Sequence, residues 1–200
     1  MATTSDPHGH HDWHSREYVD DWIGRDVTRD DERRPLLRRL AEELAFAPDA
    51  PVRLLDVGGG YGMLTSEVLD VYPNCHVVLH DFSQPMFDHA RERLGERVER
   101  VEFVVSDLRS PDWVDVLDGD FDAVVSSIAL HNVRDPDRVR AIYEEWRPLV
   151  RDGGRVANLD YVFPGLDVDT QLDWLRAAGF HDARCPFEHE RQALVLAAAG

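Results

Sequence analysis

Residues 54–62 read Leu-Leu-Asp-Val-Gly-Gly-Gly-Tyr-Gly, an apolar run that ends in an acid and continues into alternating glycines, Gly58, Gly60 and Gly62. Glycine has no Cβ, so a ligand can approach the backbone of such a loop closely. A helix that follows the loop presents its free N–H groups to the same crevice. The stretch therefore predicts a strand, a loop and a helix that together bind a nucleoside-bearing cofactor.

The spacing of the glycines indicates which cofactor to expect. A dinucleotide-binding loop has the pattern Gly-x-Gly-x-x-Gly, and counted from Gly58 its third glycine falls on Met63. The pattern here is Asp-x-Gly-x-Gly-x-Gly, which begins at Asp56. It resembles the class I S-adenosylmethionine-dependent methyltransferases, in which this loop packs against the methionine part of the cofactor. The alternative is an ordinary glycine-rich turn, because short motifs often mislead.

The resemblance gives Asp56 a role beside the loop. The methionine part of the cofactor carries an amino group and a sulfonium, so a nearby acid is favourable. The three alternate glycines would then lie under the same part of the cofactor.

Composition favours a protein of one domain that acts on a small molecule. The chain has 200 residues and a formal net charge of -17, and its 22 basic residues are all arginine. Such a charge repels a phosphate backbone, so we expect no nucleic-acid partner. The sequence has no apolar run long enough to span a bilayer and no signal peptide, so we also expect no membrane partner and a cytoplasmic location. A homodimer is left open.

Metal binding is not expected. Cys75 and Cys185 lie far apart and in no metal-ligand spacing, so we interpret both as packed thiols. Imidazole is a common metal ligand, but the N-terminal histidines lack a fixed spacing. They are His8, His10, His11 and His14.

After the glycine loop, apolar strands alternate with amphipathic helices. Strands are expected at 76–80, 101–105, 122–128, 155–159, 183–188 and 192–197, and helices at 63–71, 83–94, 137–149 and 169–178. Alternating units with fully apolar strands predict a parallel sheet covered by helices on both faces. The resemblance implies an α/β Rossmann-like, doubly wound, seven-stranded sheet in which only the last strand is antiparallel.

The first fifty residues differ from the rest. Residues 1–50 are polar and hold two amphipathic helices, expected at 15–25 and 35–44, which we predict to form a helical cap on the methyltransferase domain, residues 51–200. Residues 161–168 are too few for a substrate-covering insertion at that place. The cap is therefore predicted to be the lid, and deletion of residues 1–25 should weaken substrate binding.

Further cofactor contacts are expected just after the other strands, because ligands of open parallel sheets lie beyond the strands' carboxyl ends. The resemblance implies that Asp81 accepts hydrogen bonds from both ribose hydroxyls, and a helix cap is the alternative role. It also implies that Asp107 and Leu108 meet the adenine. Phe82 either stacks beside the base or packs in the core, and Ser126 lies close to the expected sulfonium.

Two residues are candidates for catalysis. Methyl transfer depends largely on proximity and orientation, so a general base is optional. His131 is the first candidate because it follows the fourth strand and histidine titrates near neutral pH. Its alternative is a structural histidine that bonds loop backbone. Tyr18 is a second candidate, and Asp160 and Tyr161 are weaker ones.

The sequence thus predicts an S-adenosylmethionine-dependent methyltransferase that acts on a small-molecule acceptor. Residues 126–131 read Ser-Ser-Ile-Ala-Leu-His, without the Asn-Pro-Pro-Tyr signature of base or amide methylation. A non-catalytic sensor of S-adenosylmethionine is the alternative that the glycine loop does not exclude. A nicotinamide oxidoreductase is disfavoured by Met63.

Overall fold

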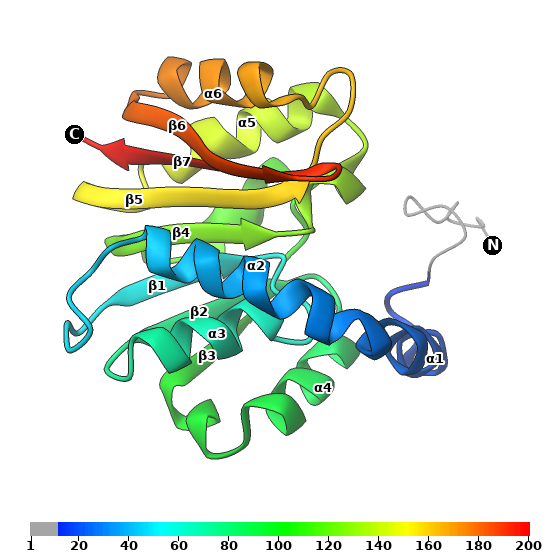
Figure 1. Cartoon of the computed structure of the whole chain (residues 1–200). Coiled ribbons are helices and arrows are strands. Elements are labelled where there is room, and N and C mark those ends of the chain that lie inside the picture. The colour runs from blue at the N-terminus through cyan, green and yellow to red at the C-terminus, as the bar shows by residue number, and fades with distance from the viewer. Residues whose placement is uncertain (1–11) are drawn as a thin grey trace.

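Seven strands form one sheet in this computed structural model, which describes residues 12–200 (Figure 1). The strands are β1 (Arg53–Val57), β2 (His76–Asp81), β3 (Val101–Val105), β4 (Phe121–Ser127), β5 (Val150–Tyr161), β6 (Phe180–His189) and β7 (Gln192–Ala199). Their order across the sheet is β3-β2-β1-β4-β5-β7-β6. Strands β1 to β5 pair in parallel, and β7 runs antiparallel to both β5 and β6. The expected seven-stranded Rossmann-like sheet is confirmed.

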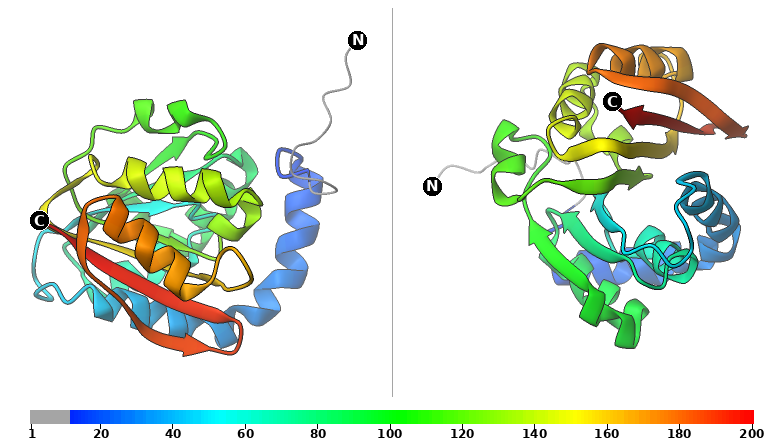
Figure 2. Two further views of the ribbon diagram at one scale, coloured as in Figure 1. Left: turned by 90° about the horizontal axis from the view of Figure 1, so that it is seen from above. Right: turned by 90° about the vertical axis from the view of Figure 1, so that its left-hand side faces the viewer.

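Helices cover both faces of this sheet (Figures 1 and 2). The α-helices are α1 (Arg16–Asp26), α2 (Asp30–Glu43), α3 (Met63–Val71), α4 (Gln84–Leu94), α5 (Pro136–Trp146) and α6 (Val168–Ala177). Short 3-10 turns are η1 (Val27–Arg29), η2 (Gly95–Arg100), η3 (Pro111–Val116) and η4 (Leu130–Val133).

The strands are buried on both faces because alternate side chains point to opposite helix layers. Leu54 and Val125 belong to the core under α1, α2 and α3. Leu55 and Val124 belong to the core under α5 and α6. This arrangement explains why the strands are nearly continuous apolar runs.

Several expected boundaries are wrong: α5 ends at Trp146 rather than at Leu149, β6 begins at Phe180 rather than at Ala183, and α2 and β5 differ most. Helix α2 begins at Asp30 rather than at Pro35, which lies inside it. Its first turn is acidic, which favours a helix N-terminus. Strand β5 begins at Val150, so Gly153 and Gly154 lie within the strand rather than before it. The pairing of β4 with β5 shifts register at this place, which is how a bulge accommodates extra residues.

The predicted cap helices are present and occupy two places. Helix α2 packs on α3 against one face of the sheet. Helix α1 lies on the side toward which β4 points, beyond the carboxyl ends of the parallel strands (Figure 1). Its capping residue Ser15 accepts a hydrogen bond from the Tyr18 N–H. No helix within residues 12–200 is long and apolar enough to cross a bilayer.

Candidate active site

A cavity of about 380 Å³ lies at the carboxyl ends of β1, β2 and β4, where it meets the cap. Seven of the eleven leading candidates for the site line it: Gly58, Gly60, Asp81, Phe82, Asp107, Leu108 and His131; the weaker candidate Tyr161 lines it as well. The cap contributes further walls: Trp13, Trp22, Asp26, Arg29, Arg33 and Leu37. The cavity therefore joins the strand ends to the N-terminal segment.

The glycine loop needs its glycines for two reasons. Gly58, Gly60 and Gly62 have φ angles of 67°, 52° and 78°, in the left-handed region that disfavours side chains. A Cβ on Gly58 would also lie 2.6 Å from the Cβ of Ala129. The loop thus presents bare backbone to the cavity, and Gly62 forms the N-cap of α3.

Asp81 ends β2 with its carboxylate held by backbone. One oxygen accepts the Gly60 N–H and the other accepts the Ser83 N–H, each at 2.9 Å. Burial is the main cause that raises the pKa of Asp81 to about 6. Each oxygen keeps acceptor capacity, so the carboxylate can bind a diol and also shape the loop. The two roles weighed for Asp81 from the sequence are compatible.

The residues expected around the adenine lie together after β3. Asp107 accepts the Arg109 N–H at 2.9 Å, and Leu108 accepts the Arg138 Nε–H at 2.6 Å. Phe82 also lines the cavity, and the His14 ring packs edge-on against the Phe82 ring with the two centroids 5.4 Å apart. A carboxylate acceptor, loop backbone and an aromatic ring thus border the same cavity.

Four predicted residues lie outside the cavity wall: Asp56, Gly62, Ser126 and Tyr18. Asp56 is fully buried beneath the loop and accepts the Thr65 hydroxyl at 2.7 Å. Burial raises its pKa to about 7, and Asp81 adds to the shift. Ser126 is fully buried and donates to the Val57 carbonyl at 2.9 Å. Asp56 and Ser126 are therefore core residues that hydrogen-bond Thr65 and Val57 and do not line the cavity.

His131 is held by a buried carboxylate. Its Nδ1 lies 2.7 Å from Asp160 Oδ1, and its backbone N–H donates to Asp160 Oδ2 at 3.0 Å. The Asp160 side chain is fully buried at the end of β5, whereas that of His131 is 23% exposed. An Nδ1–H donated to the carboxylate leaves Nε2 as the nitrogen that carries a lone pair. The carboxylate thus fixes the orientation of the imidazole.

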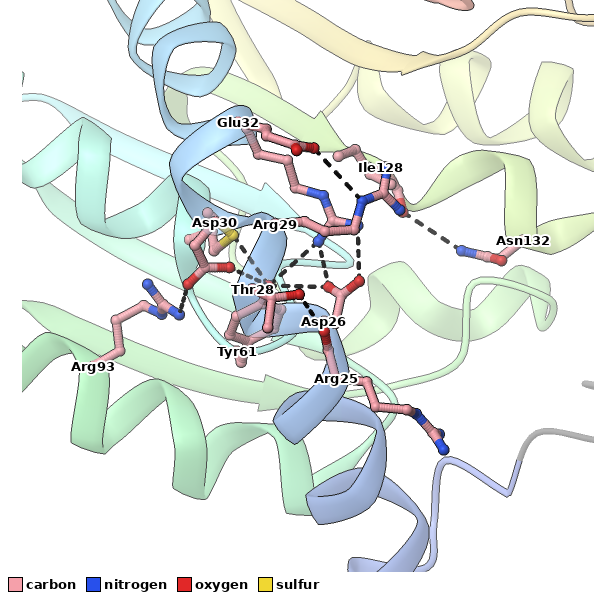
Figure 3. Close-up of polar contacts among 12 residues, drawn as sticks. Arg25, Asp26, Thr28, Arg29, Asp30, Glu32, Tyr61, Arg93, Ile128 and Asn132 are labelled. Carbon is pink, nitrogen blue, oxygen red and sulfur yellow. Dashed lines mark hydrogen bonds and ion pairs between the residues drawn. The ribbon is translucent and has the colours of Figure 1, made fainter.

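A cluster of paired charges ties the cap to the glycine loop (Figure 3). The Tyr61 hydroxyl lies 3.1 Å from an Asp26 oxygen and 2.9 Å from an Asp30 oxygen. Arg33 forms an ion pair with Asp26, and Arg93 from α4 forms one with Asp30. The pKa of Tyr61 is raised, mainly by burial, so the hydroxyl stays protonated as a donor. The cap is thus hydrogen-bonded to the loop.

The sequence interpretation missed the partners that organise the strand ends. His80 and Ser106 line the cavity and bond to each other at 2.9 Å. Ile128 also lines it, with a φ of 52° that is strained for a β-branched residue. No local pattern identifies these residues, because a histidine inside an apolar strand and an isoleucine after one are ordinary.

Within the part of the chain that the structure describes, no group of three or more His, Cys, Asp or Glu is placed to hold a metal ion. His8, His10 and His11 lie outside the described residues.

A family model described as a methyltransferase domain matches residues 54–154, which span β1 to the first part of β5. The chain is 36% identical over 128 residues to a demethylmenaquinone methyltransferase of Clavibacter sepedonicus, covering 64% of this chain and 49% of that protein. It is 36% identical over 103 residues to a malonyl-[acyl-carrier protein] O-methyltransferase of Geobacter sulfurreducens, covering 52% and 36%. The chain spans about half the length of the curated relatives it matches.

Solved structures share the fold at low sequence identity. An O-methyltransferase family protein from Burkholderia thailandensis has a TM-score of 0.74 at 18% identity, over 92% of this chain and 59% of that one. Human N-acetylserotonin methyltransferase in complex with S-adenosylmethionine has a TM-score of 0.72 at 17% identity, over 94% and 57%.

Proposed function

We propose, from the premise that the chain belongs to the methyltransferase domain family, that it transfers a methyl group from S-adenosylmethionine to a small-molecule acceptor. The observation that carries this proposal is one cavity lined by two chemically different sets of groups. The strand-end loops supply acceptors and bare backbone, and His131 with Asp160 supplies an oriented imidazole.

The cavity fits the cofactor. Gly58 and Gly60 line it with bare backbone, and Asp81 has free acceptor capacity for a diol. Asp107 and Leu108 would hold the base, and the loop would hold the methionine part. When bound, S-adenosylmethionine supplies a methyl group on a sulfonium that is already activated for displacement. The remaining task of the chain is to orient the acceptor and move a proton.

His131 is proposed to take that proton at Nε2. Asp160 fixes the tautomer and stabilises the imidazolium that results, as the acid does in an oriented acid–base pair. This chemistry suits an acceptor that loses a proton on methylation, such as a phenol or enol. The cap residues Trp22 and Leu37 form an apolar part of the cavity wall, and this part excludes water from the methyl transfer.

A non-catalytic sensor is the second function considered. A sensor needs no proton acceptor, whereas His131 borders the cavity and its ring is aligned by the buried Asp160 carboxylate, which also accepts the backbone N–H groups of His131 and Tyr161. The pair favours the enzyme.

The test is formation of S-adenosylhomocysteine from S-adenosylmethionine with a panel of hydroxylated aromatics, enols and thiols. We expect turnover that depends on the acceptor and falls in His131→Ala. A wild-type protein that binds no S-adenosylhomocysteine contradicts the proposal. Wild-type binding without turnover on any acceptor favours the sensor.

We further propose a cytoplasmic location, and a homodimer is the assembly to test. Cell fractionation tests the first, and light scattering after size-exclusion chromatography tests the second.

A further inference from the structure

A buried histidine connects the two loops that are proposed to hold opposite ends of the cofactor. His80 is the penultimate residue of β2 and is 1% exposed. Its Nδ1 lies 3.4 Å from the Gly58 nitrogen, in the glycine loop. Its Nε2 lies 2.9 Å from the Ser106 hydroxyl, next to Asp107. One imidazole thus contacts both the loop proposed to hold the methionine part of the cofactor and the turn proposed to hold its adenine.

The hydrogen-bond directions follow from the partners. A backbone N–H only donates, so His80 Nδ1 accepts from Gly58. The Ser106 hydroxyl donates to the Trp113 carbonyl at 2.9 Å, so it accepts from His80 Nε2–H. The chain of bonds runs from Gly58 through one neutral tautomer to Trp113.

The surroundings keep this imidazole neutral. Burial is the first cause that lowers the pKa of His80 to about 4. The ring packs at 5.0 Å from the Trp113 ring, which limits its movement. The His80 carbonyl also accepts the Gly59 N–H at 2.9 Å, so both backbone and side chain hold the loop. Because both ring nitrogens are hydrogen-bonded and the ring is held in place, the positions of the two loops are linked through it.

We propose that His80 is a positioning residue that couples the glycine loop to the turn at Ser106 and Asp107, so that the two ends of the cofactor site are set together. The inference rests on the proposed function, because it concerns the same site. It extends that function by assigning a role to a strand residue that borders the cavity and holds the loops proposed to contact the cofactor.

The test compares two ligands by calorimetry. Adenosine occupies only the base and ribose positions, whereas S-adenosylhomocysteine also needs the glycine loop. If His80 carries the coupling, Ser106→Ala weakens S-adenosylhomocysteine binding by roughly fivefold to tenfold and adenosine binding by distinctly less, since one hydrogen bond is involved. In a His80→Leu background, Ser106→Ala should change both affinities equally.

Conservative variants separate hydrogen bonding from packing. His80→Asn keeps an acceptor near Gly58, and His80→Gln keeps a donor near Ser106. We expect each to recover part of the affinity for S-adenosylhomocysteine that His80→Leu loses. Val78→Ala, on the same strand but outside the cavity wall, is the matched control, which should reduce stability without changing affinity.

Two outcomes overturn the inference. One is equal weakening of both ligands by Ser106→Ala in the native His80 background. The other is Asn and Gln variants that bind no better than His80→Leu, which means that the ring acts only by packing. Ser106→Ala keeps the test open if the His80 variants do not fold. A wild-type protein that binds neither ligand instead defeats the proposed function.

Discussion

The strand-end loops and the N-terminal cap both contribute walls to one cavity, and they do so by different means. At the strand ends, Asp56 and Asp81 are buried without an arginine partner, and burial raises the pKa of both. In the cap, Asp26 and Asp30 are each paired with an arginine. The comparison teaches that the strand-end wall leaves the Asp81 acceptors at the cavity, with Asp56 buried behind it, whereas the cap acids are neutralised by Arg33 and by Arg93 of α4.

The two walls also differ in what fixes the positions of their residues. Each strand-end residue follows a strand whose register is fixed by its neighbours in the sheet. The cap depends on side chains that meet across distant parts of the sequence, such as Tyr61 with Asp26. We therefore expect strand-end changes to affect cofactor binding and cap changes to affect the acceptor.

The largest effect is expected at the proposed general base, His131. His131→Ala should lower turnover by roughly a hundredfold or more, because general base catalysis commonly contributes that much. Calorimetry should show unchanged affinity for S-adenosylhomocysteine. His181→Ala is the matched control, since His181 pairs with Asp182 on the exposed surface of β6. An unaffected rate in His131→Ala returns His131 to a structural role.

Asp81→Ala should weaken S-adenosylhomocysteine binding by about a hundredfold, because hydrogen bonds to a charged group are strong and the Gly60 N–H loses its partner. The measurement is a dissociation constant from calorimetry. Asp173→Ala removes an exposed acid on α6 and should have no effect. Equal affinities of the two variants would remove Asp81 from the cofactor site.

Breaking the link between the glycine loop and the cap should act on the acceptor instead, because it releases the cap. Tyr61→Phe removes the hydroxyl that bonds Asp26 and Asp30, and we expect the KM for the acceptor to rise by roughly threefold to tenfold. Deletion of residues 1–25 should act in the same direction and more strongly. Tyr72→Phe removes a hydroxyl that bonds α2 away from the cavity and serves as control. A Tyr61→Phe effect on cofactor affinity alone would contradict the division between the walls.

The last effect concerns folding rather than ligands, and it is a pH slope in stability. Asp56 has a pKa of about 7 when folded, above its ordinary value near 3.8, so the fold binds a proton that the unfolded chain releases. The stability that this proton provides is fully present below about pH 4 and is lost as pH rises through about 7. Asp56→Asn should flatten that fall in urea unfolding, and Thr65 remains able to donate to the amide oxygen. An unchanged slope would mean that Asp56 is ionised when folded.

The sequence predicted the strand ends better than the cap. Repeated apolar strands and the glycine loop are local patterns, and they located the sheet, Asp81 and Asp107 correctly at one edge. Local patterns do not carry side-chain pairings between distant segments, so the link from Tyr61 to Asp30 was not foreseen. The same limit applies to His131, whose partner Asp160 lies on another strand and was ranked only as a weaker candidate. The family match confirms the resemblance read from residues 54–62.

The central claim is that the strand-end wall binds S-adenosylmethionine rather than a dinucleotide. Its most direct test is calorimetric titration of the wild-type chain with S-adenosylhomocysteine and, separately, with NADH. We predict saturable binding of one S-adenosylhomocysteine per chain and no heat above dilution for NADH. Binding of NADH, or of neither ligand, would contradict the account.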